Sequence, residues 1–281
     1  YQLTFGVNNK DAVVTVKNGK MSGGSVAEVY LTAGTLYMDN ITINSTAGSS
    51  VVQNVQGDLY LDHCTIDTQV AGAGGIWDFT TNHKTVINDS TISVKDTLAV
   101  FHNGSTGGFE LEVTNSTLEC TNAQAVYISG STKTTAEAGK NQQAKFTGCT
   151  ITGTTGIEGK FTDIVLNNCK VTATAQAPTF EQYNNGTTTS GFAVVSTDNS
   201  MAPASPTPTA KIEINGGEYT GLVGLSQLIN SEEYPDFEEA TYEVTGGEFT
   251  SDPTTYVTGE APVAEIVADQ TTSYAVGSTS I

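Results

Sequence analysis

A nine-residue unit recurs along this chain and constrains its fold more than any other feature. The unit is clearest in residues 59–67, Leu-Tyr-Leu-Asp-His-Cys-Thr-Ile-Asp, whose positions are labelled a to i. Position c is apolar in every repeat: Val16, Met38, Leu61, Ile87, Val113, Phe146, Leu166, Ile214, Val244. Position h is apolar as well: Met21, Ile43, Ile66, Ile92, Leu118, Ile151, Val171, Tyr219, Phe249. The repeats follow one another at intervals of 20 to 33 residues, with one interval of 48, and this pattern predicts a stacked β solenoid.

The backbone must turn between positions c and h. Side chains alternate between the two faces of a strand, and c and h lie an odd number of residues apart, so a straight strand cannot bury both. A one-residue corner in the left-handed backbone region would correct the phase, and that region favours Gly, Asn, Asp and His. Position e holds only these types: Asn18, Asn40, His63, Asp89, Asn115, Gly148, Asn168, Gly216, Gly246. We therefore expect a left-handed corner at position e in every repeat.

Short apolar segments also lie between the repeats, for example at 51–52, 76–77, 100–101 and 126–128. They are separated by Gly, Thr, Ser and Asn, which favour turns, and helical periodicity is absent. The sequence therefore predicts an all-β fold, a right-handed parallel β-helix of about nine coils. The hand follows from the rule for parallel crossovers.

The repeat favours one domain over residues 1–252, with insertions near 173–190, 196–210 and 230–239. Residues 253–281 are expected to form a C-terminal capping segment, in which a β-hairpin between 264 and 276 closes the last sheet edge. The chain begins on Tyr1 rather than Met, and we expect it to be part of a longer multidomain chain.

The charge balance limits the possible partners. The net charge is −19, and all 11 basic residues are lysines. Nucleic acids and anionic membrane surfaces require clustered cations, so neither is an expected partner. No apolar run approaches the length of a membrane span, and membrane insertion is not expected. The acidity is typical of a secreted protein that must stay in solution.

Four cysteines, Cys64, Cys120, Cys149 and Cys169, show no metal-binding spacing. Three of them occupy position f, just inside the expected corner. We expect four reduced, buried thiols that behave as small apolar side chains, with no disulfide and no metal.

The repeat with Asn at the corner resembles the right-handed parallel β-helix of the pectate-lyase-like superfamily over nearly the whole chain. Residues 244–257, Val-Thr-Gly-Gly-Glu-Phe-Thr-Ser-Asp-Pro-Thr-Thr-Tyr-Val, are similar to a Gly-Gly-x-Phe-x-x-Asp-Pro-x-x-Tyr-Val signature. That signature is found at the ends of β-helix segments in large secreted surface proteins of gut bacteria. The resemblance implies an extracellular, bacterial cell-surface or adhesin-like module, and it implies no established activity.

Two classes of function compete. Pectate lyases hold calcium with carboxylates and commonly use Arg as the base and substrate clamp. Polygalacturonases carry Asn-Thr-Asp, Asp-Asp and Gly-His-Gly motifs. The chain has neither Arg nor these motifs. These absences favour a non-catalytic module, without catalytic residues or cofactor, that binds glycan or displays loops. The alternative is a carbohydrate-active enzyme, a polysaccharide hydrolase or lyase on the same fold, with Asp62, Asp67 and Asp78 as candidate carboxylates.

Candidate contacts with a polysaccharide or host glycan come from the apolar segments between repeats. Their alignment puts one row at Val52, Trp77, Phe101 and Tyr127, and the next row at Gln53, Asp78 and His102. Neighbouring rows face opposite ways. An inward aromatic row would be a core stack, whereas an outward row would be an apolar strip suited to stacking on sugar rings. The candidate glycan contacts are Trp77, Asp78, Phe101, His102 and Tyr127.

Overall fold

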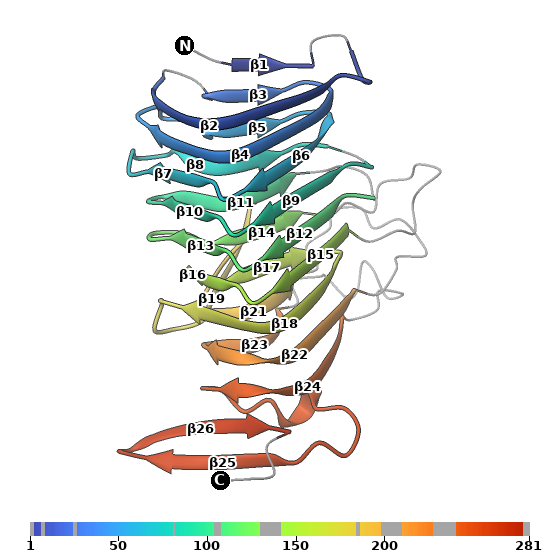
Figure 1. The fold of residues 1–281 in the computed structure, drawn as a ribbon. Coiled ribbons are helices and arrows are strands. Elements are labelled where there is room, and N and C mark those ends of the chain that lie inside the picture. Colours follow the sequence, from blue (N-terminus) through green and yellow to red (C-terminus); the bar gives the residue numbers. More distant parts are fainter. Residues whose placement is uncertain are drawn as a thin grey trace.

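The structure is a computed structural model, which describes residues 3–6, 9–24, 27–80, 82–103, 108–129, 142–183, 186–197, 210–226 and 240–277, with only the backbone for 182, 183, 186, 187, 225 and 226. These residues are mostly β-strand, and the strands form two long stacked parallel sheets, an arrangement consistent with a parallel β-helix (Figure 1). Within the described ranges there is no α-helix, and the one helical element is the short 3-10 turn η1 (Thr254–Tyr256).

The first sheet, here sheet A, has nine strands, and each pairs in parallel with the next. In spatial order they are β1 (Leu3–Phe5), β3 (Val29–Leu31), β5 (Val52–Asn54), β8 (Gly74–Asp78), β11 (Thr97–Asn103), β14 (Val126–Ser129), β17 (Ile157–Lys160), β21 (Phe192–Thr197) and β23 (Leu222–Ser226). These strands contain the apolar segments that the sequence places between repeats.

The second sheet, sheet B, has 15 strands and contains the repeats themselves. Its strands are β2 (Val13–Gly23), β4 (Gly34–Ser45), β6 (Gly57–Asp62), β7 (Thr65–Thr68), β9 (Lys84–Asn88), β10 (Thr91–Val94), β12 (Glu110–Thr114), β13 (Thr117–Cys120), β15 (Gln142–Thr147), β16 (Thr150–Gly153), β18 (Thr162–Ala173), β22 (Lys211–Thr220), β24 (Thr241–Phe249), β25 (Val263–Ala268) and β26 (Thr271–Val276). Along the chain, strands of sheet A alternate with strands or strand pairs of sheet B, so neighbouring strands in each sheet come from successive repeats.

The pairing register places each sequence position directly over its equivalent in the next repeat. Met38 pairs with Leu61, and Ile43 pairs with Ile66, as positions c and h require. Both columns are buried in the core between the sheets from the second repeat onward. In the first repeat, Val16 and Met21 are only partly buried and pack against the core from one side.

The corner at position e is confirmed in eight of the nine repeats. Positive φ angles occur at Asn18, Asn40, His63, Asp89, Asn115, Gly148, Asn168 and Gly216. The ninth expectation, Gly246, is wrong: the positive φ lies at the following Gly247, at 126°. The pairing of β22 with β24 shifts register at this point, and the two consecutive glycines allow the turn to move by one residue.

Side chains at the corner add hydrogen bonds between neighbouring repeats. Asn40 Nδ2 donates to Asn18 Oδ1 over 2.8 Å. At position f, the backbone N–H of Cys64 donates to Ser90 Oγ over 2.9 Å, and that of Ser90 donates to Ser116 Oγ over 3.1 Å. The small polar residues at position f therefore satisfy backbone groups that the corner removes from the regular ladder.

The described part of the expected insertion at 173–190 contains an antiparallel hairpin, β19 (Thr179–Tyr183) and β20 (Gly186–Ser190). Most of the insertion at 196–210 and all of that at 230–239 lie outside the described residues. The C-terminal hairpin forms as expected: β25 pairs with β26, and β26 pairs antiparallel with β24 at the end of sheet B.

All four cysteines are free and buried, as the sequence predicts. Burial raises the pKa of the Cys64 and Cys120 thiols, which lowers the fraction of reactive thiolate. The Cys149 and Cys169 thiols are in contact with each other in adjacent repeats.

We expect thiol titration of the native protein to find no rapidly reacting cysteine, because all four thiols are shielded from solvent. Titration after unfolding without reductant should count four thiols. A count of two would show that Cys149 and Cys169 form a disulfide.

The left-handed corner can be tested at Asn115, whose φ is 49°. The substitution Asn115→Val should lower the free energy of unfolding by ~1–2 kcal/mol, because a β-branched residue is strained in this region. Asn115→Gly is the matched control and should cost much less, since glycine adopts the conformation freely. Equal losses of stability in urea unfolding would contradict the assignment of the corner.

Candidate functional site

The three aromatic residues singled out from the sequence are neighbours on sheet A. Trp77 pairs with Phe101, and Phe101 pairs with Tyr127, on β8, β11 and β14. The residue before Trp77 in this row is Gln53, because Val52 pairs instead with Ile76. The sequence alignment of Val52 with Trp77 was therefore wrong by one residue. The three aromatic residues are called the aromatic row below.

The aromatic row faces away from the core. Its immediate neighbours along the strands, Ile76, Val100 and Val126, are fully buried members of the core cluster, and none of the three aromatics belongs to that cluster. Because side chains alternate along a strand, the aromatic row lies on the outer face of sheet A. Trp77 and Phe101 are partly exposed, and Tyr127 is 7% exposed. Of the two orientations left open by the sequence, the outward one is found.

The rings of the aromatic row contact one another from strand to strand. The centroids of Trp77 and Phe101 lie 5.8 Å apart with the rings nearly perpendicular, at 77°. Phe101 and Tyr127 are stacked at 5.7 Å and 25°. Phe79 extends the patch beside Trp77 through an edge contact at 6.4 Å. These contacts are of the favourable edge-to-face and offset-stacked kinds, which hold the rings in defined orientations.

Polar side chains lie around the aromatic row. Asn103 and Ser129 follow Phe101 and Tyr127 by two residues on the same strands, and Gln53 precedes Trp77 in the row. The next residue in the row after Tyr127 is Glu158, on β17. The patch is therefore an apolar strip with hydrogen-bonding groups at its ends and along one side.

Glu158 is fully buried on this outer face, under the hairpin formed by β19 and β20. Gln124 Nε2 and Thr189 Oγ1 each donate to its Oε2 over 2.8 Å, and Thr197 Oγ1 donates to its Oε1 over 3.1 Å. Sequence reasoning missed Glu158, although extending the second-strand alignment by one repeat places it directly after Tyr127. Its buried, hydrogen-bonded carboxylate holds the hairpin against the end of the aromatic row.

Asp78 and His102, the other two candidate contacts, point into the interior and are 0% exposed. They cannot touch a ligand on the outer face, so the expectation that they bind glycan is wrong. The cause is the alternation of the strand: each follows an outward aromatic residue, Trp77 or Phe101, by one position.

The Asp78 carboxylate is held by four hydrogen bonds inside the core. Its Oδ2 accepts from Asn54 Nδ2 over 2.9 Å and from Thr85 Oγ1 over 2.7 Å. Its Oδ1 accepts from the backbone N–H of Thr80 over 2.9 Å and from the Thr80 hydroxyl over 2.5 Å. A buried carboxylate is tolerated only when it is hydrogen-bonded in this way, and the network joins two successive repeats.

His102 lies one repeat further along. Its Nε2 lies 2.9 Å from the carbonyl oxygen of Thr80, and its ring stacks on Phe109 at 3.8 Å and 5°. Its Nδ1 has no hydrogen-bond partner among the described residues. Burial lowers the pKa of His102, and the nearby Asp78 carboxylate opposes that effect in part. The neutral imidazole therefore donates from Nε2 to Thr80.

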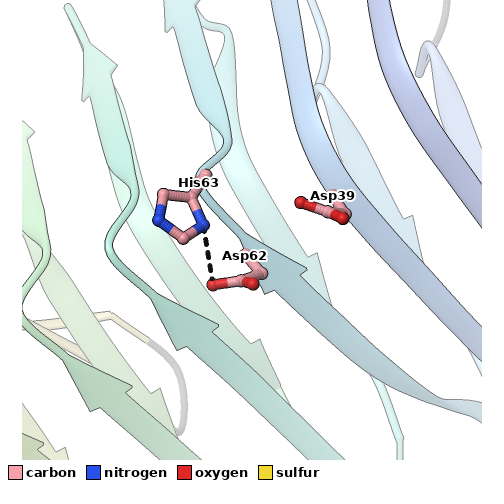
Figure 2. Close-up of side chains that lie close together, drawn as sticks. All are labelled: Asp39, Asp62 and His63. Carbon is pink, nitrogen blue, oxygen red and sulfur yellow. Dashed lines mark ion pairs between the residues drawn. The ribbon is translucent and has the colours of Figure 1, made fainter.

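A different cluster on the outer face of sheet B contains Asp39, Asp62 and His63 (Figure 2). One ligand atom of each lies within 4.8 Å of the others. Lys17 Nζ lies 3.0 Å from Asp39, and His63 Nδ1 lies 3.1 Å from Asp62. The three side chains are open to solvent, and each carboxylate already has a basic neighbour, so the cluster is an ordinary surface arrangement of charges.

The three carboxylates considered for catalysis lie in different surroundings. Asp78 is inside the core, whereas Asp62 lies on sheet B beside His63. Asp67, also on sheet B, accepts a hydrogen bond from Gln69 over 2.8 Å. A two-carboxylate glycosidase requires both groups to flank one sugar linkage, and the buried Asp78 cannot be one of them.

Comparison with known proteins gives no relative from which a function could be transferred: no protein-family model, no curated protein and no solved structure matches the chain. Within the described ranges, no helix has the length and apolar character needed to cross a membrane. The functional argument therefore depends on the geometry alone.

The buried histidine makes a prediction about pH. His102 is neutral in the folded state, whereas the same histidine can take up a proton in the unfolded state. Below pH ~6.5 the unfolded chain therefore binds more protons than the folded chain. The contribution of His102 is therefore present above that pH and is lost as the pH falls, by up to about 1.4 kcal/mol per pH unit. The difference in unfolding free energy between wild type and His102→Gln should shrink from pH 7 to pH 5. A constant difference would contradict a neutral, buried His102.

Proposed function

We propose that the chain is a non-catalytic, adhesin-like module of a secreted or cell-surface bacterial protein, and that it binds glycan along the aromatic row of sheet A. The single observation that carries this proposal is that Trp77 and Phe101 lie partly exposed on the outer face of sheet A, with the buried Tyr127 stacked against Phe101. Large aromatic side chains are usually buried in a core, and a contiguous outward patch of them is a feature of binding surfaces.

The spacing of the row suits a polysaccharide. Neighbouring strands in a sheet lie ~4.8 Å apart, so the aromatic side chains recur at a distance similar to the length of one sugar residue. Aromatic rings stack on the apolar faces of sugars, and polar groups such as Gln53, Asn103 and Ser129 can bind the hydroxyl groups at their edges. The net charge of −19 disfavours anionic polysaccharides, so the proposed ligand is a neutral glycan.

The finer fold assignment belongs to the same proposal: a right-handed parallel β-helix of about nine coils, one for each repeat of the sequence. Its support is the alternation of strands between sheets A and B along the chain and the in-register pairing of successive repeats. Parallel crossovers are right-handed with very few exceptions, which gives the hand. The terminal signature resembling those of gut bacterial surface proteins supports the extracellular location.

The arrangement around the row favours binding over hydrolysis. Within the described part of sheet A, Glu158 is the one carboxylate in the row, and its hydrogen bonds to Gln124, Thr189 and Thr197 engage both of its oxygens. Glycoside hydrolysis requires a second carboxylate across the scissile bond. We therefore propose that bound glycan is released unchanged.

The fluorescence of Trp77, the sole tryptophan, can report binding. A neutral oligosaccharide identified on a glycan array should shift this emission and protect it from a soluble quencher. Phe101→Ala, which keeps the reporter, should weaken binding by about tenfold, equivalent to ~1.4 kcal/mol, through loss of one stacking surface. Tyr37→Ala is the matched control, because Tyr37 is a 40%-exposed aromatic on sheet B, and it should leave binding unchanged.

Two results would contradict the proposal. Equal weakening by Phe101→Ala and Tyr37→Ala would remove the site from sheet A. New reducing ends released from the bound oligosaccharide would show that the chain is an enzyme instead.

A further inference from the structure

Among the described residues, the strands at the two ends of the stacked sheets are paired on one side only. Sheet A begins with β1 and ends with β23, and sheet B begins with β2 and ends with β25; within the described ranges, every other strand of the two sheets has a partner on each side, although β24 pairs with β26 only at Gly247–Phe249. The two groups of terminal strands lie at opposite ends of the molecule (Figure 1). Unpaired edges carry free N–H and C=O groups that can pair with another strand.

Exposed apolar side chains gather on these four terminal strands. The described part of the chain has five large apolar residues that are exposed, and four of them lie here: Leu3 on β1 at 43%, Val13 on β2 at 68%, Leu222 on β23 at 38% and Val267 on β25 at 68%. The fifth is Tyr37. In addition, Phe5, Val14, Val16 and Met21 contact the core and remain partly exposed at the N-terminal end. Exposed apolar side chains on edge strands favour association with another chain.

The two ends carry opposite charge. Described residues 9–24 contain Lys10, Lys17 and Lys20; Lys17 pairs with Asp39, which leaves Lys10 and Lys20 against the single carboxylate of Asp11. Described residues 240–277 contain no lysine and six carboxylates, of which the first pairs with Lys211: Glu243, Glu248, Asp252, Glu260, Glu265 and Asp269. The N-terminal end therefore complements the C-terminal end of another molecule of the same chain, whereas two like ends would repel.

The strand directions also match. All sheet B strands from β2 to β24 are parallel along the pairing path. Strand β26 is antiparallel to β24, and β25 is antiparallel to β26, so β25 runs in the same direction as β2. A second molecule translated along the stack would place its β2 beside β25 as a parallel neighbour, which continues the ladder of sheet B.

We propose that this chain associates head to tail, with the basic end at β1 and β2 of one molecule docked on the acidic end at β25 of the next. The contact is between two different surfaces, so translation repeats it without closure and yields linear rods. The aromatic row lies on the side of the stack and remains accessible in such a rod. The inference is independent of glycan binding, because neither surface includes Trp77, Phe101 or Tyr127.

Sedimentation velocity of the 281-residue chain over a range of concentrations tests the inference. Wild type should form dimers and longer species as the concentration rises. Lys10→Glu/Lys20→Glu at one end and Glu260→Lys/Glu265→Lys at the other should each weaken association by about tenfold or more, because each reduces the charge complementarity between the two ends. All four residues are exposed.

The control variant is Lys95→Glu/Lys145→Glu, which makes the same change of net charge with exposed lysines in the middle of the stack. It should retain wild-type association. The variant Glu260→Lys/Glu265→Lys lowers the net negative charge, so general repulsion would predict stronger association from it, opposite to our expectation. A wild-type chain that stays monomeric at its highest attainable concentration, or equal effects of end and middle variants, would overturn the proposal.

Discussion

The structure depends on parallel pairing between equivalent residues of successive repeats. Each strand in the stack satisfies its backbone groups with the repeats before and after it, so one register fixes the whole ladder. That register places Leu61 beneath Met38 and Ile66 beneath Ile43, and it stacks the corner residues above one another. A slip of one residue would turn every apolar column outward, which makes the register strongly specified.

The same alternation that builds the core also produces the candidate site. On β8 and β11, each outward aromatic residue is followed by a buried polar residue, Asp78 or His102. The interior can hold these polar groups because Asn54, Thr80 and Thr85 satisfy Asp78, while His102 remains neutral. The outer rings of the candidate site thus lie on strands that are anchored from the inside, and not on a separate loop.

The ends of the stack have a different physical character from its middle. Among the described residues the ladder ends in two edges, and at the N-terminal edge the core ends in the partly exposed Val14, Val16 and Met21. The C-terminal hairpin covers the last repeat in sheet B, but it moves the free edge outward to β25 and does not remove it. Under the head-to-tail proposal, the opposite charges of the two ends bring these edges together between two copies of the chain.

The sequence by itself determined the all-β stack, the buried columns c and h, the left-handed corners in eight of nine repeats, the four buried thiols and the C-terminal hairpin. These follow from local chemistry, because alternation, the left-handed preference of Asn and Gly, and turn composition act within a few residues.

Only the tertiary structure decided that Trp77 and Phe101 face outward while Asp78 and His102 face inward, since alternation fixes opposite faces without saying which is the core. It also decided the pairing of Gln53 rather than Val52 with Trp77 and the shift from Gly246 to Gly247, because both depend on register between distant segments. The position of Glu158 beneath the hairpin required the folded chain as well, since its partners Gln124, Thr189 and Thr197 are brought together by pairing across successive repeats.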